Sequence, residues 1–250
     1  MICCHLQKCK KMTFMLLFAL TQAYAKEKPV TVAYGSWEPF FGKDLKNLGS
    51  INEVVRAAFE KKGYKVTFKF MPWARAEQMV KLGSFDLTVS YLKTKSRVNE
   101  FIFSKHSISK HKTYFYKKKG NTKVSIKAIE DSVKYSIGMT RGYHYSDEFE
   151  QFIKRHNLRP ELSNSDIIGL RKIIKGRIEI YPVEEFVADY QLKKMGLQNQ
   201  AEPEAYLLAQ TLNYAMFHKN TKKEILVDFD KGLEELVQEG KFTEYITLEK

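Results

Sequence analysis

The histidines and acidic pairs of this chain could hold a metal or transfer protons, but their spacing serves neither purpose. His106 and His111 are too far apart to share one helical face, and adjacent acids such as Glu184 and Glu185 point in different directions. The sequence has no Gly-x-Ser-x-Gly turn, phosphate-binding glycine loop or His-Glu-x-x-His motif. It therefore predicts a protein that is not an enzyme and uses no metal or other cofactor.

The N-terminus has the pattern of a secretory signal peptide. Lysines among residues 8–11 precede an apolar run over residues 12–24, which ends in Ala-Tyr-Ala at residues 23–25. Cleavage after Ala25 would begin the mature chain at Lys26, in the periplasm, and would remove all three cysteines with the leader. Two alternatives stay open, a retained anchor helix and a translation start at Met12.

Composition predicts a folded protein that does not bind nucleic acid. The 250 residues include 17 Phe, 14 Tyr and 2 Trp, enough for a substantial core. The net charge of +13 falls to +10 without the leader lysines. The remaining lysines are scattered, and their one run, at residues 117–119 before Gly120, is typical of a solvated turn.

Strand and helix patterns alternate along the first part of the mature chain. Helix patterns begin at Ser50, with a capping box to Glu53, and run over residues 73–82. Apolar runs predict strands between them, at residues 30–34, 66–70 and 86–91. This alternation predicts a mostly parallel sheet covered by helices.

A second block repeats the alternation. Asp166 is predicted to cap a helix that ends at Gly176, and the polar residues 198–205 are predicted to form a loop. The other helices are predicted near residues 146–156, 184–194 and 225–237. Strands are predicted at residues 113–116, 135–139, 177–181 and 212–217.

Two α/β blocks predict a molecule with two lobes. After the leader, residues 1–25, the first lobe is expected over 26–110 and the second over 111–213, with 214–250 returning to the first lobe as its C-terminal helix. Ligands of open α/β sheets lie beyond the carboxyl ends of the strands. We therefore expect a ligand site in the cleft between the lobes.

Several short stretches together carry a family resemblance. They are Gly-Ser-Phe-Asp-Leu-Thr-Val-Ser at 83–90, Thr-Lys-Ser-Arg at 94–97, Phe103-Ser104, Ile137-Gly138, Arg141-Gly142 and Gly-Arg-Ile-Glu at 176–179. Their order and spacing resemble those of type II periplasmic solute-binding proteins, the amino-acid-type family 3 of ABC transporters. The resemblance covers nearly all of the mature chain. It implies two lobes, each a mostly parallel sheet flanked by helices, and a monomer.

The resemblance implies roles for two charged residues. The arginine of the family's Thr-x-x-Arg motif grips the ligand's carboxylate, here Arg97, and a planar guanidinium matches a carboxylate bidentately. Glu184 stands where the family has an acid for the ligand's ammonium, although Pro182 departs from the family pattern. Glu184 could equally begin the next helix, where a carboxylate suits the helix dipole.

The same resemblance implies further ligand contacts. They are Tyr34, Trp37, Trp73, Arg75, Ser90, Tyr91, Gly142, Tyr143 and His144. Tyr143 and His144 replace small hydroxyl residues of the family and would narrow the pocket. For Tyr34, Trp37 and Trp73 the alternative is core packing, and for Arg75 and His144 it is an exposed position.

The function implied is that of a periplasmic receptor. It would capture an amino acid or related carboxylate by closing its lobes, then dock on the permease of an ABC transporter. Two alternatives belong to other classes. One is a dehydratase-like enzyme on the same scaffold, with Glu184 as its acid. The other is a sensing module of a membrane signalling protein.

Overall fold

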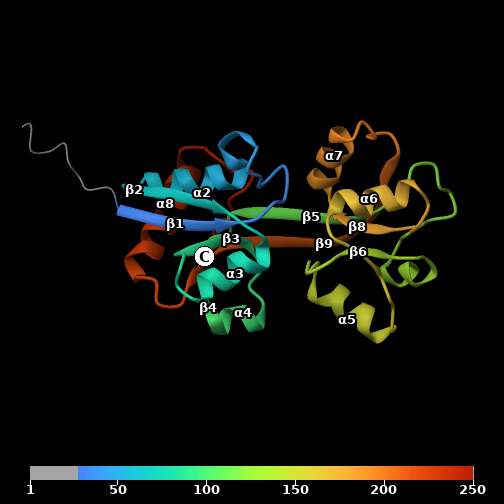
Figure 1. The fold of residues 1–250 in the computed structure, drawn as a ribbon, viewed down its shortest axis with the longest axis horizontal. Helices are drawn as coiled ribbons and strands as arrows, with labels where there is room; N and C mark the ends of the chain where they lie inside the picture. Colours follow the sequence, from blue (N-terminus) through green and yellow to red (C-terminus); the bar gives the residue numbers. More distant parts are fainter. Residues whose placement is uncertain (1–27, 250) are drawn as a thin grey trace, which may run out of the picture.

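The computed structural model describes residues 28–249, which form two lobes side by side (Figure 1). The predicted leader and its cleavage site after Ala25 lie outside the described residues. In chain order the elements are β1 (Lys28–Tyr34), the 3-10 helix η2 (Lys46–Leu48), α2 (Ser50–Glu60), β2 (Tyr64–Phe70), α3 (Trp73–Lys81), β3 (Leu87–Tyr91), α4 (Lys95–Glu100), β4 (Phe101–Phe103), β5 (Ser109–Lys118), the 3-10 helix η3 (Ile129–Lys134), β6 (Gly138–Thr140), α5 (Asp147–Arg155), β7 (Glu161–Ser163), α6 (Asp166–Ile174), β8 (Tyr181–Glu184), α7 (Glu185–Lys194), β9 (Ala201–His218) and α8 (Lys223–Gln238).

The first lobe consists of β1–β4 with α2, α3, α4 and α8. Strands β2, β1 and β3 pair in parallel, as the alternation predicts, and α2 buries its apolar face against them. Helix α8 crosses α2 at Gly232, where a Cβ would lie 2.1 Å from the Ala58 carbonyl oxygen. The predicted capping box is wrong, because α2 has Gly49 as its N-cap and Ser50 as its first residue.

The second lobe consists of β6–β8 with α5, α6 and α7. Ser146 caps α5 as a side-chain acceptor from the Phe149 amide, at 3.1 Å. The predicted cap at Asp166 is wrong, because Ser165 is the N-cap of α6. The Asp166 carboxylate instead accepts hydrogen bonds from hydroxyl groups of β6 and β8. The strand predicted at 177–181 lies later, as β8, and Ile180 forms only an isolated bridge with Ile137.

Two long strands run from one lobe to the other. β5 and β9 pair antiparallel over most of their length, and they carry the connection that Figure 1 shows between the lobes. β9 also pairs antiparallel with β3 and β4 in the first lobe, and β5 pairs antiparallel with β8 in the second. The predicted loop at 198–205 is wrong, since β9 begins at Ala201.

The seven-stranded sheet that β9 and β5 join is consequently mixed, whereas β6 and β7 form a separate parallel pair. Parallel pairs occur within each lobe, and the antiparallel pairs all involve β5 or β9. The two-lobed α/β architecture predicted from the sequence is confirmed. The boundaries predicted at residues 110/111 and 213/214 stay predictions.

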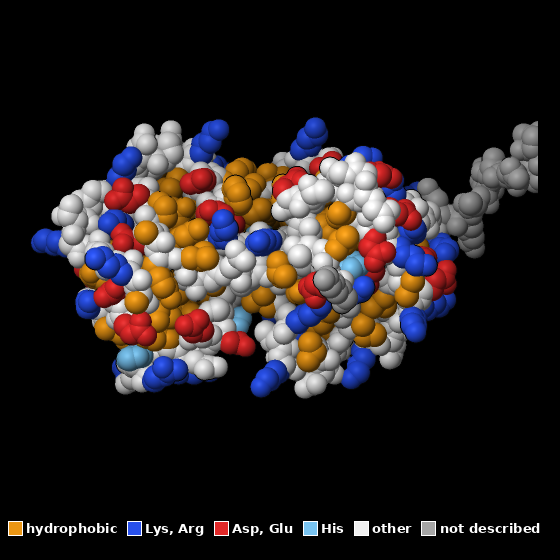
Figure 2. All heavy atoms as spheres, turned by 180° about the vertical axis from the view of Figure 1, so that it is seen from behind, with side chains coloured by type: hydrophobic (Ala, Val, Ile, Leu, Met, Phe, Trp, Pro, Cys, Tyr) orange, Lys and Arg blue, Asp and Glu red, His pale blue; other side chains and the backbone are white. Residues whose placement is uncertain are grey.

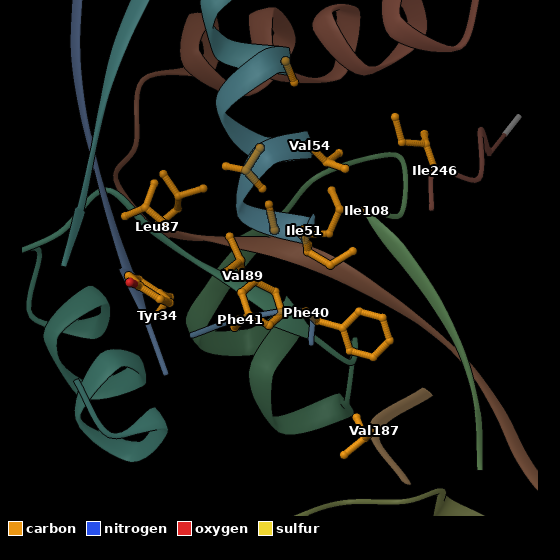
Figure 3. Close-up of a cluster of buried hydrophobic side chains, with 14 of the residues drawn as sticks. Tyr34, Phe40, Phe41, Ile51, Val54, Leu87, Val89, Ile108, Val187 and Ile246 are labelled. Carbon is orange, nitrogen blue, oxygen red and sulfur yellow. The ribbon is translucent and has the colours of Figure 1, made fainter. Parts of the chain in front are cut away.

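The lobes share a hydrophobic core on the side of α7. Phe40 of the first lobe and Val187 of α7 belong to one buried cluster, and Figure 3 shows them near one another. The Phe40 and Phe186 rings have centroids 6.4 Å apart, and the Lys194 ammonium lies 2.6 Å from the Glu38 carboxylate. The molecule is therefore joined along this side.

Among the described residues, no helix is both long and apolar enough to cross a bilayer. The same part of the chain holds no group of three or more histidine, cysteine or acidic side chains placed to bind a metal ion.

Candidate functional site

A cleft of about 620 Å³ lies between the lobes. Its walls come from the ends of β1–β3 and from α3 and α4 on one side, and from the β6–α5 turn, the start of α6 and the end of β8 on the other. It continues into a more open hollow between α4 and α5. Figure 2 shows, from behind, the notch between the lobes at this edge.

Most of the predicted ligand contacts line this cleft. They are Trp37, Trp73, Ser90, Tyr91, Arg97, Gly142, Tyr143, His144 and Glu184. Tyr34 does not, because its ring is buried in the core against Phe68 and Phe70. Arg75 also lies outside the lining and is exposed on α3. For these two residues the structure favours the alternative that the sequence left open.

Trp73 is held in place by backbone contacts. Its indole N–H donates to the Ser36 carbonyl at 3.1 Å, and the Tyr91 hydroxyl donates to the Trp73 carbonyl at 3.1 Å. The indole lies directly over Gly35, where a Cβ would come within 2.6 Å of the ring. These contacts fix the ring as a wall of the cleft. The neighbouring Tyr91 hydroxyl is buried, and its burial raises the pKa of that group.

Arg97 lies in the cleft but already has a carboxylate partner. Thr94 caps α4 and accepts from the Arg97 amide at 3.4 Å, which positions the arginine one turn into the helix. The guanidinium donates to Glu77 of α3 through Nε at 3.2 Å and Nη2 at 3.1 Å. It also lies 4.6 Å from the centroid of the Tyr91 ring.

Glu184 both caps the following helix and lines the cleft. Its Oε2 accepts from the Val187 amide at 2.8 Å, so it caps α7. Its side chain also lines the cleft, although the residue is only 4% exposed. The other oxygen, Oε1, is buried and has no hydrogen-bond partner. Glu184 is therefore a carboxylate with one oxygen used by the fold and one available.

His111 of β5 faces the Glu184 carboxylate. Its Nδ1 lies 3.8 Å from Glu184 Oε1, too far for a hydrogen bond, and has no partner. Its Nε2 is 2.8 Å from the Ser109 hydroxyl oxygen. The ring packs between Trp37 and Phe40, with centroid distances of 4.5 and 4.7 Å. Sequence reasoning considered His111 only as a metal ligand and missed this position.

Asp166 is the second buried carboxylate of the cleft. It accepts from the hydroxyl groups of Thr140 at 2.8 Å, Tyr181 at 3.0 Å and Tyr143 at 3.3 Å. Burial raises the pKa of this carboxyl group, and the nearby Glu184 carboxylate raises it further, against the lowering effect of the three hydroxyl donors. The resemblance implied Tyr143 as a ligand contact. Its hydroxyl group is also used within the protein, as a hydrogen-bond donor to Asp166.

The turn after β6 is already partly bonded within the protein. The Tyr143 amide donates to the Thr140 carbonyl at 3.2 Å, and Arg141 Nε donates to Asn164 at 3.4 Å. His144 lies 3.0 Å from Asp147 at the mouth of the cleft. Gly142, with a φ of 79°, permits the turn.

Polar alternation in β5 was the signal for the missed residues. Ser109, His111 and Thr113 occupy alternate positions and are all buried, as expected for one face of a strand. No pattern in the sequence indicates that Glu77 pairs with Arg97, because the two residues lie on different helices.

Comparison with known proteins identifies a family for the chain. The sequence model of the bacterial extracellular solute-binding proteins, family 3, matches residues 30–247. No curated protein matches the sequence.

Many solved structures share the fold. A histidine kinase sensor domain with similarity to periplasmic binding proteins superposes with a TM-score of 0.74 at 18% identity, covering 88% of this chain and 94% of that one. The probable amino-acid ABC transporter extracellular-binding protein YtmK of Bacillus subtilis gives 0.72 at 20% identity, with 87% and 95% covered. A substrate-binding protein of an ABC uptake transporter from Streptococcus pneumoniae, with bound histidine, gives 0.71 at 21% identity, with 86% and 89% covered. At these identities the likeness is one of fold, whereas the sequence match extends over almost the whole described chain. The chain belongs to the bacterial extracellular solute-binding proteins, family 3.

Proposed function

We propose that this protein is a periplasmic receptor that captures a small polar solute carrying an amino group and delivers it to the permease of an ABC importer. The observation that carries the proposal is Glu184 Oε1, a buried carboxylate oxygen without a partner on the wall of a cleft between two lobes. A buried acceptor left unbonded costs roughly 1–3 kcal/mol. An ammonium group of the solute would supply the missing donor.

Amino acids and related carboxylates are the solutes implied by the family resemblance, with Arg97 as the anchor. Both Nε and Nη2 of Arg97 donate to Glu77. Binding of a carboxylate along this edge of the guanidinium therefore requires the Arg97–Glu77 pair to open. The aromatic walls formed by Trp37 and Trp73 suit any small solute with an apolar part.

Capture is a hinge motion of the two lobes. The connecting strands β5 and β9 would bend while contacts from both lobes close on the solute. Solute contacts to both walls stabilise the closed form. The size of this stabilisation is the difference between the binding free energies of the solute for the closed and the open forms. The receptor acts as a monomer in this proposal and performs no chemistry on the solute.

A sensing role is the second candidate. It is favoured by one observation, the fold shared with a histidine kinase sensor domain at a TM-score of 0.74. The same cleft would then report solute binding to a membrane signalling protein. A pull-down from membranes in the presence and absence of solute separates the two roles by the partner recovered.

The test of the receptor proposal is Glu184→Gln. The amide keeps an oxygen to cap α7 but removes the charge, so the fold is retained while the ammonium loses its partner. We expect at least a tenfold loss of affinity, or about 1.4 kcal/mol, in calorimetry with the best solute from a thermal-shift screen of amino acids and amines.

Glu185→Gln is the matched control, since this neighbouring acid does not line the cleft. It should leave the affinity unchanged. Equal affinity of wild type and Glu184→Gln would reject the proposed site, and turnover of the bound solute would instead support an enzyme.

A further inference from the structure

The anion-binding group of the cleft is neutralised by the protein itself. Arg97 donates two parallel hydrogen bonds to the two oxygens of Glu77, at 3.2 and 3.1 Å. This is the bidentate geometry that a solute carboxylate would use. Both side chains are only partly exposed, at 24% and 31%, so the pair is less solvated than a contact on the open surface. A second carboxylate at this position would lie next to the charge of Glu77.

The remaining charges of the described cleft wall are predominantly negative. Besides the Arg97–Glu77 pair, the lining contains the buried carboxylates Asp166 and Glu184 and one further guanidinium, Arg141. Arg141 is exposed and donates to Asn164. The two histidines of the lining are His111 and His144. Outside the Arg97–Glu77 pair, the cleft thus presents two buried carboxylates and one exposed guanidinium, a balance that favours a cation over an anion.

Two buried polar atoms without hydrogen-bond partners mark where the cation would bind. Glu184 Oε1 and His111 Nδ1 are both buried, both lack a partner, and lie 3.8 Å apart. When His111 carries its proton on Nε2 and donates it to Ser109, its Nδ1 has a free lone pair. One ammonium nitrogen can lie about 2.9 Å from both atoms and donate to each. The Trp37 ring, beside His111, adds an aromatic face suited to a cation.

We propose that the cleft selects a small organic amine without a carboxylate group, with its ammonium held between Glu184 and His111, and that Glu77 excludes amino acids by keeping Arg97 occupied. This inference rests on the proposed receptor function and names the chemical class of its solute. Glu77 acts as a positioning residue, because it determines specificity through Arg97.

The experiment compares solutes that differ only by the carboxylate. The pairs are cadaverine with L-lysine, agmatine with L-arginine, and histamine with L-histidine. Calorimetry on the wild-type protein should give, for at least one pair, an amine that binds at least tenfold more tightly than its amino acid. Glu77→Gln frees the guanidinium and should shift this ratio at least tenfold toward the amino acid.

The control for this substitution is Glu100→Gln. Glu100 pairs with Lys81 at 2.8 Å on the surface of the same lobe and does not line the cleft. The affinity ratio should be the same as in wild type. Thermal melting of each variant verifies that it is folded.

A second variant, Arg97→Gln, keeps the proposal testable if Glu77→Gln does not fold. It leaves the Glu77 charge unpaired at the cleft, so amine affinity should rise. A tenfold loss of affinity for the amino acid of a pair, with the affinity for its amine unchanged, would instead identify Arg97 as a carboxylate anchor.

The outcomes separate the inference from the receptor function. Tighter binding of the amino acid by wild type, or a ratio unaffected by Glu77→Gln, overturns the inference and leaves the receptor intact. Failure of all three amines to bind also overturns it. The receptor proposal fails only if, in addition, the wider screen finds no solute whose binding depends on Glu184.

Discussion

At the scale of single residues, three of the eight buried side-chain atoms that lack a hydrogen-bond partner in the described part of the chain belong to residues of the cleft. Glu184 Oε1, His111 Nδ1 and Asn213 Oδ1 are buried without partners, and all three residues line the cleft. Asn213 uses its amide N–H groups on Ser90, at 3.2 Å to the carbonyl and 3.0 Å to the hydroxyl, and so presents only its oxygen. All three atoms are hydrogen-bond acceptors if His111 is neutral with its proton on Nε2, which matches a solute that donates.

Asp166 gives a prediction about pH. Burial raises the pKa of its carboxyl group above the pKa in the unfolded chain. At a pH between the folded and the unfolded pKa, this carboxyl group is therefore more fully protonated in the folded protein than in the unfolded chain. The contribution of this residue to stability is therefore full below the unfolded pKa of about 4 and is lost as the pH rises through the folded pKa. We expect Asp166→Asn to lack this dependence.

Urea denaturation at several pH values between 4 and 8 would measure the effect. The free energy of unfolding of Asp166→Asn, relative to wild type, should be higher at neutral pH than near pH 4. A difference that does not change with pH would contradict the raised pKa.

At the scale of elements, the lobes depend on close approaches that only glycine allows. Gly169 of α6 packs against the Tyr181 ring, where a Cβ would lie 2.1 Å from Cζ. The hydroxyl of that ring donates to Asp166 at 3.0 Å. The helix therefore positions one of the donors that hold the second carboxylate of the cleft.

Gly169→Ala tests this contact. The added methyl group would push Tyr181 out of place, and overpacking of this kind costs typically 1–3 kcal/mol, partly offset by the better helix propensity of alanine, which contributes up to about 1 kcal/mol. We expect a net loss of stability in thermal or chemical denaturation, together with weaker solute binding.

Arg171→Ala is the comparison for this prediction. Arg171 is exposed on the same helix, so its removal should change stability by no more than about 0.5 kcal/mol. A Gly169→Ala protein as stable as this control would show that α6 can shift away from the ring.

At the scale of the whole molecule, one side is joined and the other is open. The joined side has the shared core of Phe40 and Val187 and the ion pair of Glu38 with Lys194. The open side lies between α4 and α5, where the notch appears in Figure 2. Strands β5 and β9 connect the lobes between these sides, so closing would bring α4 and α5 together.

Small-angle X-ray scattering should detect this closure. The radius of gyration of the wild-type protein is expected to fall when a saturating solute is added, because the lobes approach one another. At a solute concentration near the wild-type Kd, Glu184→Gln should show a much smaller fall than wild type, because its affinity is expected to be at least tenfold lower. A radius that stays constant in solute-saturated wild type would mean that the cleft binds without closing.

The sequence by itself determined the fold class and much of the list of cleft residues. Hydrophobic periodicity, Gly stops and short motifs are local, so they were sufficient to predict the α/β lobes and to bring Arg97, Trp73, Tyr91 and Glu184 to attention. Local patterns were also the reason for the errors. Residues 198–205 are polar and contain Pro203, yet they belong largely to β9 because β5 supplies the partner strand.

Only the tertiary structure decided which of these groups meet. Arg97 and Glu77 are on different helices, and His111 and Glu184 are on adjacent strands that are far apart in the sequence. Tyr34 and Arg75 carry suitable side chains but face the core and the solvent. The charge of the cleft depends on such long-range pairs, since a guanidinium with a carboxylate partner is neutralised and attracts an anion less strongly than a free one.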